Sequence, residues 1–334
     1  MMKIVITDYP DVLGRDLPYE IHILKTGLPG AEVSVFPYSD DDRDSFYREA
    51  ADADALLTAF IPLDRDAMSH LQRLKCVSFN STGYDFIDYA EAVRQNIAVI
   101  PIGEYCTDEV ADHTMALLLA LTRGLKHYTA DVDVRRRWQY YSIRGLKRLD
   151  GCTMAIFGFG KIGRAVAKRA AGFGLRILAV DPRLADEDAK ADCAEKATPE
   201  QAWKEADIIT NHMNRTEDNR SMFCMDVFRK MKKHPIFINC GRGGCVCQDD
   251  LVKALDEGLI SAAGLDVLEQ EAPDLDRCGL TNRENVNLTP HAAFYSETSV
   301  RALQRISCEN VVHYLNREYD QVFKIVNKDE ISLP

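Results

Sequence analysis

Short apolar runs alternate, throughout the first hundred residues, with segments in which apolar residues recur every three or four positions. The apolar runs are rich in β-branched residues and predict strands, whereas the segments between them, such as residues 44–51 and 85–95, predict helices. The predicted strands are residues 4–7, 32–36, 55–58, 76–79 and 97–100. Strands that alternate with helices indicate a parallel sheet with helices on both faces.

A second series of strands and helices begins near residue 152. Before it lies a longer helical pattern, residues 107–128, with Thr107 as the predicted N-cap, and then a charged and aromatic loop, residues 135–148. The later strands are predicted at residues 152–157, 176–180, 207–210, 235–239, 263–267 and 286–289, and the last helix at residues 297–315. A chain of 334 residues with two such series predicts two α/β domains, each with its own core.

A glycine pattern follows the first strand of the second series. Gly158, Gly160 and Gly163 occupy the glycine positions of G-x-G-x-x-G, and a helical pattern follows them. Between a strand and a helix this pattern predicts a dinucleotide site, because the glycines permit a tight turn, close approach of a pyrophosphate and helix packing. Asp181 ends the next strand, where it would bind ribose hydroxyls and repel a 2′-phosphate. This arrangement predicts NAD rather than NADP, and Arg183 weakens that preference.

An arginine, a carboxylate and a histidine follow three of the late strands: Arg242, then Glu269 or Glu271, then His291. Because ligands bind at the carboxyl ends of parallel strands, these side chains are expected at the same edge as the glycine loop. A guanidinium would hold a substrate carboxylate in a bidentate fork, and an imidazolium would give a proton to the neighbouring carbonyl oxygen. A carboxylate beside the histidine would stabilise its protonated form. Spacing alone does not choose between the two glutamates. His113 lies within a predicted helix, which indicates a structural or surface role for it.

Composition excludes several other classes of function. A net charge of −11 argues against nucleic acid, which requires a basic face. The most apolar segment, residues 115–121, is too short to span a membrane, and no secretory signal opens the chain. Ten cysteines without regular spacing indicate a reducing compartment, and Cys245 with Cys247 lacks the second pair of ligands that a metal site requires. We therefore expect a soluble, cytoplasmic protein without a metal.

The sequence resembles the D-isomer-specific 2-hydroxyacid dehydrogenase family over nearly its full length. The matching runs are residues 81–88, 158–163, 239–244, 264–267 and 289–291. In the family pattern the acid is the fifth residue after the aspartate of the L-D-V run, which selects Glu271 over Glu269. Residues 109–114, 291–297 and 326–329 resemble most the branch that contains the C-terminal-binding proteins, which usually has tryptophan in place of Phe294.

The resemblance implies two Rossmann-like or flavodoxin-like domains with parallel sheets and an active site in the cleft between them. Residues 1–102 with 296–334 would form the substrate (catalytic) domain, and residues 103–295 the NAD-binding Rossmann domain. The helix that begins at Thr107 would cross between the domains and take part in a homodimer.

The glycine loop and the resemblance together predict three sets of site residues. The catalytic residues are Arg242, Glu271 and His291. The cofactor-binding residues are Cys106, Gly158, Phe159, Gly160, Lys161, Ile162, Gly163, Asp181, Met213, Asn214, Asn219, Cys240, Gly241, Arg242, Asp266, His291 and Phe294. The substrate-binding residues are Ser81, Thr82, Gly83, Tyr84, Arg242 and His291.

The favoured function is an NAD-dependent D-2-hydroxyacid dehydrogenase that reduces a 2-oxo acid. Aromatic residues expected near the substrate, Tyr84, Tyr105, Phe294 and Tyr295, favour a substrate with an apolar side chain. One alternative is a glyoxylate or hydroxypyruvate reductase. The other is an NADH-sensing scaffold, because animal members of the resembled branch act as transcriptional corepressors. The complete set of catalytic residues favours an enzyme.

Overall fold

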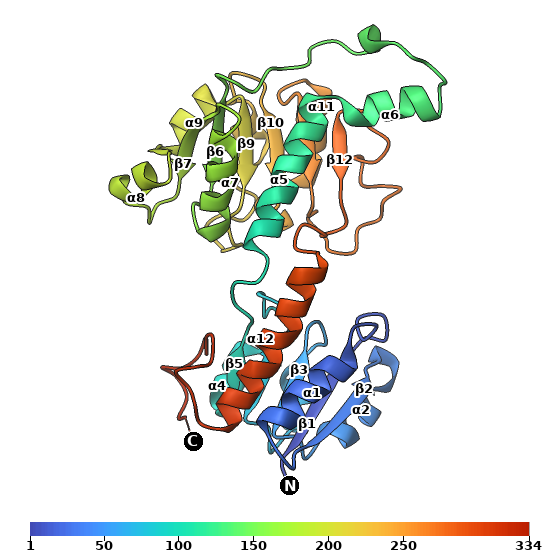
Figure 1. Cartoon of the computed structure of the whole chain (residues 1–334), viewed down its shortest axis with the longest axis vertical. Coiled ribbons are helices and arrows are strands. Elements are labelled where there is room, and N and C mark those ends of the chain that lie inside the picture. The colour runs from blue at the N-terminus through green and yellow to red at the C-terminus, as the bar shows by residue number, and fades with distance from the viewer. Residues whose placement is uncertain (334) are drawn as a thin grey trace. The chain divides into compact units, whose positions relative to one another are not determined.

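The computed structural model describes residues 1–333 of the chain, which form two compact units (Figure 1). The first unit combines Met1–Tyr105 with the segment that begins at Ser296, and the second unit is Cys106–Tyr295. The sequence predicted the first boundary at residue 102. Each unit has its own parallel sheet, so the predicted α/β class with two parallel sheets is confirmed.

Five parallel strands form the sheet of the first unit, in the order β2-β1-β3-β4-β5. They are β1 (Lys3–Asp8), β2 (Glu32–Pro37), β3 (Ala55–Thr58), β4 (Cys76–Phe79) and β5 (Ala98–Ile100). Alternate residues of β1 enter different clusters: Val5 packs on one face, while Ile4 and Ile6 pack on the other. Because both faces are covered, the strand is apolar along its length rather than alternating.

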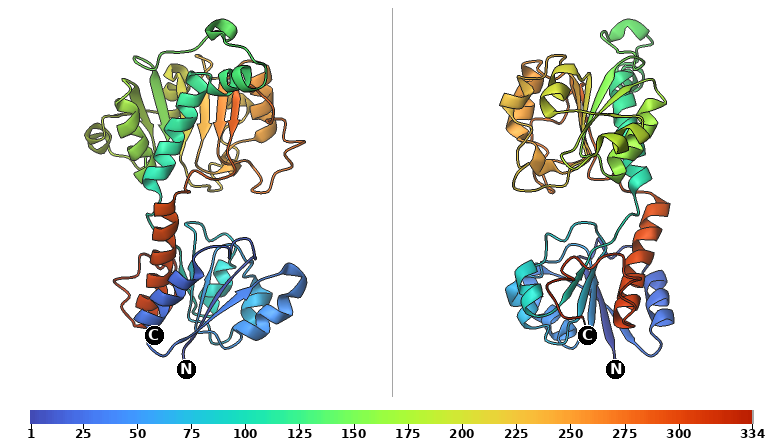
Figure 2. Two further views of the ribbon diagram at one scale, coloured as in Figure 1. Left: turned by 45° about the vertical axis from the view of Figure 1, so that its right-hand side comes forward. Right: turned by 90° about the vertical axis from the view of Figure 1, so that its left-hand side faces the viewer.

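Helices from both ends of the chain cover the first sheet (Figure 2). On one face lie α1 (Leu17–Gly27) and α12 (Glu297–Leu315), and on the other α2 (Arg43–Ala50), α3 (Arg65–Ser69) and α4 (Tyr89–Arg94). Ser296 caps α12 in a capping box with Ser299. The helix buries Cys308 and Val311 against β3 and β4, which fixes the C-terminal segment in this unit.

The seven parallel strands of the second unit follow the order β12-β11-β10-β9-β6-β7-β8. They are β6 (Thr153–Phe157), β7 (Arg176–Val180), β8 (Glu195–Lys196), β9 (Ile208–Asn211), β10 (Ile236–Asn239), β11 (Ala262–Leu265) and β12 (Val286–Leu288). Counted from β6, this is the doubly wound order 3-2-1-4-5-6 with a seventh strand added. The order reverses between β6 and β9, so a ligand site is expected outside the carboxyl ends of these strands.

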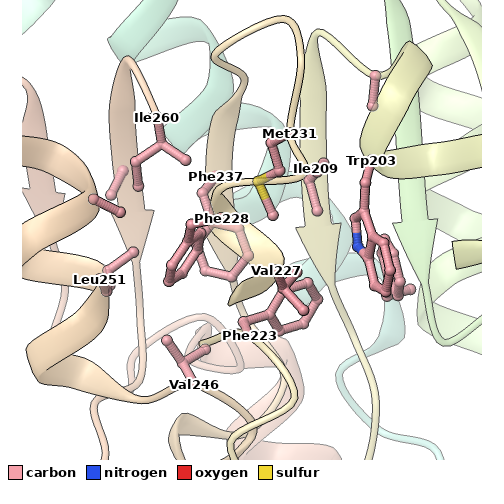
Figure 3. Close-up of a cluster of buried hydrophobic side chains, with 14 of the residues drawn as sticks. Trp203, Ile209, Phe223, Val227, Phe228, Met231, Phe237, Val246, Leu251 and Ile260 are labelled. Carbon is pink, nitrogen blue, oxygen red and sulfur yellow. The ribbon is translucent and has the colours of Figure 1, made fainter. Parts of the chain in front are cut away.

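Six helices cover the second sheet. On one face lie α5 (Thr107–Thr122), α7 (Lys161–Ala171) and α8 (Asp186–Ala191), and on the other α9 (Pro199–Glu205), α10 (Met225–Phe228) and α11 (Gln248–Asp256). Figure 1 shows α5 and α7 side by side across the strands. Under α9, α10 and α11 the core is aromatic: Phe223 and Phe237 pack edge to face with ring centroids 4.9 Å apart (Figure 3). Ile209 of β9 and Phe237 of β10 belong to this cluster, so close packing supports the two strands from which the next loops begin.

The predicted helix over residues 107–128 is wrong in its extent. The structure contains α5, a break at Gly124, and then α6 (Leu125–Asp133), and the N-cap of α5 is Cys106 rather than Thr107. Gly124 adopts φ +62°, a left-handed conformation that ends a helix and suits glycine. A β-carbon there would lie 2.9 Å from Ile143 Cδ1. The apolar periodicity continues across the break, which is why the pattern did not show it.

Two smaller differences concern short polar segments. The helix predicted over residues 85–95 is shorter in the structure, where α4 covers Tyr89–Arg94. Asp88 caps it by accepting a hydrogen bond from the Glu91 amide. Strand β8 contains only two residues, both polar, and has no sequence signal. None of the helices within residues 1–333 is both long and apolar enough to cross a membrane.

Candidate active site

The glycine loop between β6 and α7 is tightly packed at its first and third glycines and open at its second. Gly158 has φ +85°, and a β-carbon on it would lie 2.8 Å from the Met213 amide nitrogen. A β-carbon on Gly163 would lie 2.3 Å from the Gly158 carbonyl oxygen. Apart from its chain neighbours, a β-carbon on Gly160 would meet no atom of residues 1–333 within 4 Å. The first and third glycines are therefore required for packing, whereas the second faces open space.

The surroundings of this loop fit a dinucleotide. Helix α7 begins directly after Gly160, and within residues 1–333 no side chain caps it, so the positive end of the helix dipole lies at this loop. The Asp181 carboxylate accepts hydrogen bonds from the backbone amides of Phe159 (3.0 Å) and Arg183 (2.9 Å). In a dinucleotide site, the glycine loop holds the pyrophosphate and an anchored carboxylate beside it accepts hydrogen bonds from the adenosine ribose.

Gly160→Ala is expected to separate cofactor binding from stability. The cost to folding should stay within about 1 kcal/mol, because alanine is only a poorer N-cap than glycine. The affinity for NADH should fall by about tenfold or more, since the methyl group enters the space that the pyrophosphate approaches. Thermal unfolding and a fluorescence titration with NADH measure the two effects. Gly163→Ala is the matched comparison and should also destabilise the fold, by about 1–3 kcal/mol. Unchanged NADH affinity in Gly160→Ala would contradict this account of the loop.

Two buried asparagines fix the loop that carries Arg242. Asn211 ends β9 and Asn239 ends β10, and the Asn211 Nδ2 donates to Asn239 Oδ1 at 3.0 Å. The same Oδ1 accepts from the Gly241 amide at 3.1 Å, and Asn239 Nδ2 donates to the Arg242 carbonyl at 3.2 Å. Because both asparagines are at most 1% exposed, these bonds do not compete with water. This pair was not predicted, because its signal in the sequence is no more than an asparagine at the end of each of two late strands.

The Arg242 side chain is half-buried. Its Nη1 donates to the Gly241 carbonyl at 3.0 Å. Within residues 1–333 no carboxylate oxygen lies within 4.0 Å of its guanidinium nitrogens. Its positive charge still reaches Glu271 and helps to lower the pKa of that carboxyl group. The guanidinium fork is thus positioned by its loop and available to a bidentate anion such as a carboxylate.

His291 and Glu271 form the pair at the centre of the site. His291 Nδ1 lies 2.7 Å from Glu271 Oε2. The hydrogen bond with His291, together with the charges of His291 and Arg242, lowers the pKa of Glu271, so the carboxyl group is ionised at neutral pH. An ionised carboxylate only accepts hydrogen bonds, and therefore the proton between them belongs to Nδ1. This leaves the other ring nitrogen, Nε2, to exchange a proton with a ligand.

Glu269 lies elsewhere, and geometry thus separates the two glutamates that spacing left open. Its Oε2 accepts a hydrogen bond of 3.4 Å from the Gln248 amide at the start of α11. Next to it, a β-carbon on Gly243 would lie 1.7 Å from the Leu268 carbonyl oxygen. Glu269 is therefore held against α11 in a tightly packed turn, whereas Glu271 contacts His291.

Residues 115–293, more than half of the chain, match the NAD binding domain of the D-isomer specific 2-hydroxyacid dehydrogenases. The chain belongs to this family. Over 309 residues it is 33% identical to the glyoxylate reductase of Thermococcus kodakarensis, covering 90% of this chain and 92% of that one. It is 32% identical over 256 residues to the glycerate dehydrogenase of Methylorubrum extorquens, covering 75% and 79%. The crystal structure of D-lactate dehydrogenase from Aquifex aeolicus, complexed with NAD and lactic acid, matches with a TM-score of 0.82 and 25% identity, covering 96% of this chain and 97% of that one.

Membership makes the protein an NAD-dependent oxidoreductase that acts on a CH–OH group. The names of these relatives do not support the branch of the C-terminal-binding proteins that the sequence motifs predicted. Two of the runs that suggested that branch, residues 109–114 and 291–297, lie at the start of α5 and at the turn that carries His291.

Other predicted cofactor residues of the dehydrogenase lie in the segments that follow β9, β10 and β11. Asn219 closes the loop after β9, because its Oδ1 accepts from the Thr216 amide at 2.7 Å and its Nδ2 donates to the Asn214 carbonyl at 2.7 Å. Cys240 is buried, which raises the pKa of its thiol to about 12. Asp266 is also buried and forms its hydrogen bonds within the turn that carries His291. Within residues 1–333 no three side chains among His, Cys, Asp and Glu are grouped as metal ligands.

The aromatic residues predicted near the substrate differ in their surroundings. Phe294 packs against the core under α5, with its ring centroid 6.3 Å from that of His291. Tyr295 is 70% exposed. Tyr84 packs against the core of the first unit, which leaves less of its ring available to a ligand. In the loop around it, Ser81 Oγ donates to the Gly83 carbonyl at 2.6 Å.

Proposed function

We propose that this dehydrogenase reduces a small 2-oxo acid to the D-2-hydroxy acid with NADH, and catalyses the reverse reaction. The observation that carries the proposal is the 2.7 Å contact between His291 Nδ1 and Glu271 Oε2, with the charge of Arg242 close enough to act on Glu271. A proton donor and an anion-binding fork beside a dinucleotide loop are the groups that this reaction requires.

Each of the three residues has a separate task in the proposed mechanism. Arg242 binds the substrate carboxylate through both branches of its guanidinium and polarises the adjacent carbonyl group. NADH, when bound, supplies the hydride. His291 donates the proton on Nε2 to the carbonyl oxygen, and Glu271 stabilises the imidazolium and fixes its orientation through Nδ1. In the reverse direction Nε2 accepts the proton of the alcohol.

Glu271→Gln tests the acid–base pair. The amide keeps the shape of the side chain but removes the negative charge that stabilises the protonated imidazole. We expect kcat for reduction near neutral pH to fall by about tenfold or more. We also expect the pH at which reduction declines to move downward, since the proton is held less strongly. A pH–rate profile of the variant and the wild type measures both effects. An unchanged profile would show that Glu271 does not support the histidine.

The proposed cofactor is NAD rather than NADP. The charge of Asp181 stands beside the glycine loop, where it would accept hydrogen bonds from ribose hydroxyls and repel a 2′-phosphate. The remaining contacts are assigned to the predicted cofactor residues of the second unit, from Cys106 to Phe294. The predicted substrate residues Ser81–Tyr84 belong to the first unit, and their role stays a prediction.

The identity of the 2-oxo acid separates this proposal from its alternatives. The glyoxylate reductase and glycerate dehydrogenase relatives favour a small substrate, whereas the aromatic residues near His291 favour an apolar side chain. Measurement of kcat/KM with NADH for glyoxylate, hydroxypyruvate, pyruvate, 2-oxobutyrate, 2-oxoisocaproate and phenylpyruvate decides between them. Values that rise by a few-fold per carbon indicate an apolar pocket, and values that fall indicate the glyoxylate or hydroxypyruvate reductase. No turnover with any of them would favour the NADH-sensing scaffold.

We further propose that the dehydrogenase is a homodimer. An open groove of about 690 Å³ lies between α5, α6 and the end of β12 and is lined largely by apolar side chains. The segment after α6 exposes several large apolar side chains, namely Val134, Trp138, Tyr140 and Tyr141. Exposed apolar groups of this size favour a protein–protein contact. Light scattering should give twice the chain mass of 37.6 kDa, and a monomeric mass would refute the dimer.

A further inference from the structure

We propose that His113 is a positioning residue for the reaction, because it fixes, through Thr289 and Asp266, the turn that carries His291. The inference rests on the proposed role of His291. His113 belongs to α5, on the side of the sheet opposite α11, and it lies far in sequence from the catalytic residues. A hydrogen bond of 2.9 Å nevertheless links its Nε2 to Thr289 Oγ1 at the end of β12.

The direction of this hydrogen bond follows from the proton count. Thr289 has a single hydroxyl proton, and its Oγ1 donates that proton to Asp266 Oδ1 at 2.6 Å. The hydroxyl oxygen can therefore only accept from His113, which requires the proton of the imidazole to reside on Nε2. A side chain without an N–H at this position would leave the chain His113–Thr289–Asp266 incomplete.

Asp266 connects this chain to the catalytic turn. Its side chain is 1% exposed, and its two carboxylate oxygens accept hydrogen bonds from the Ala292 and Ala293 amides, each at 2.9 Å. Its backbone carbonyl accepts from the His291 amide at 2.8 Å. The segment that begins at His291 is thus held to a single buried residue by three hydrogen bonds.

His291 needs this support because its backbone is strained. Its φ of +51° lies in the left-handed region, which a residue with a side chain adopts at a cost and keeps only where its surroundings impose it. Among residues 1–333, His113 is also the one basic side chain within 4.0 Å of the Asp266 carboxylate. The distance from His113 Nε2 to Asp266 Oδ1 is 3.6 Å. Loss of His113 would remove the N–H group that donates to Thr289. It would also remove the partial positive charge of that N–H from the neighbourhood of the buried Asp266 carboxylate.

Four variants test the inference. His113→Phe keeps the ring and removes the donor, whereas His113→Gln keeps an N–H donor. Thr289→Val removes the hydroxyl in the middle of the chain. Asp112→Asn is the control on the same helix, because the exposed Asp112 pairs only with Arg169 at the surface and such pairs contribute little.

We expect His113→Phe and Thr289→Val to lower kcat by about tenfold with unchanged NADH affinity, because His291 loses its orientation rather than its chemistry. The double variant should be no slower than either single variant, since both break one chain. His113→Gln should restore most of kcat, and Asp112→Asn should match the wild type. Wild-type kcat in His113→Phe would overturn the inference, as would equal losses in His113→Phe and His113→Gln.

Hydrogen–deuterium exchange of the peptide that spans residues 289–295 gives a measurement independent of turnover. His113→Phe should accelerate exchange of the amides at 291–293 by about tenfold, while Asp112→Asn should leave it unchanged. Unchanged exchange in His113→Phe would refute the positioning role even if kcat fell. Absence of 2-oxo acid reduction by the wild type would refute the proposed function. The exchange experiment would still show whether His113 orders the turn that carries His291.

Discussion

His291→Ala is expected to lower kcat for 2-oxo acid reduction by about two or more orders of magnitude while the fold and NADH binding stay largely intact. The imidazole is 43% exposed, so its removal leaves no large cavity, and the proton donor to the carbonyl oxygen is lost. Arg242→Ala should produce a loss of similar size, because the substrate carboxylate then has no guanidinium to orient it. Steady-state kinetics, thermal unfolding and an NADH titration measure the three properties.

Glu269→Gln provides the matched control for these variants. Glu269 lies in the same turn region as Glu271 but contacts the start of α11 rather than His291. Its kcat should remain close to that of the wild type. A His291→Ala enzyme with more than about one tenth of the wild-type kcat would exclude His291 as the acid–base residue.

NADH should be preferred over NADPH by at least roughly tenfold in kcat/KM, and Asp181→Ala should narrow this preference. In the wild type the Asp181 carboxylate is held in place by two backbone amides, so it cannot turn away from a 2′-phosphate without the loss of both bonds. The variant removes the repulsion for NADPH and the ribose acceptor for NADH. Kinetics with both cofactors at one ionic strength measure the change.

Arg183→Ala is the control for the cofactor preference. The backbone amide of Arg183, not its exposed guanidinium, contacts Asp181, and therefore the variant keeps the anchored carboxylate. It should lose some activity with NADPH and retain activity with NADH. Equal or better kcat/KM with NADPH in the wild-type enzyme would refute the assignment of Asp181.

The sequence allowed the fold to be predicted closely, for reasons that are visible in its strands. Strands covered on both faces must be apolar along their length, so β3 and β4 were found with their observed bounds. The helix break at Gly124 was not predicted, because the apolar periodicity of α5 continues across it. Strand β8 was not predicted, because two polar residues at a sheet edge show no hydrophobic periodicity.

The candidate site was predictable where chemistry requires a residue type at the end of a strand. Arg242, His291 and the glycines satisfy that condition. Spacing could not choose between Glu269 and Glu271, since the turn after β11 decides which of them reaches the histidine. The asparagine pair of β9 and β10, and the link from His113 to Thr289, join segments distant in the chain and therefore have no local signal.

The position of α12 in the first unit has a consequence for synthesis on the ribosome. The second unit lies entirely within Cys106–Tyr295 and is complete before α12 is translated, whereas the sheet formed by the first hundred residues must wait for Cys308 and Val311. Until then one apolar face of β3 and β4 remains uncovered and is a natural binding surface for chaperones. A chain truncated before residue 297 and released from the ribosome should yield a protease-resistant fragment from the second unit alone. Protection of the N-terminal segment in that truncated chain would show that its sheet folds without the helix.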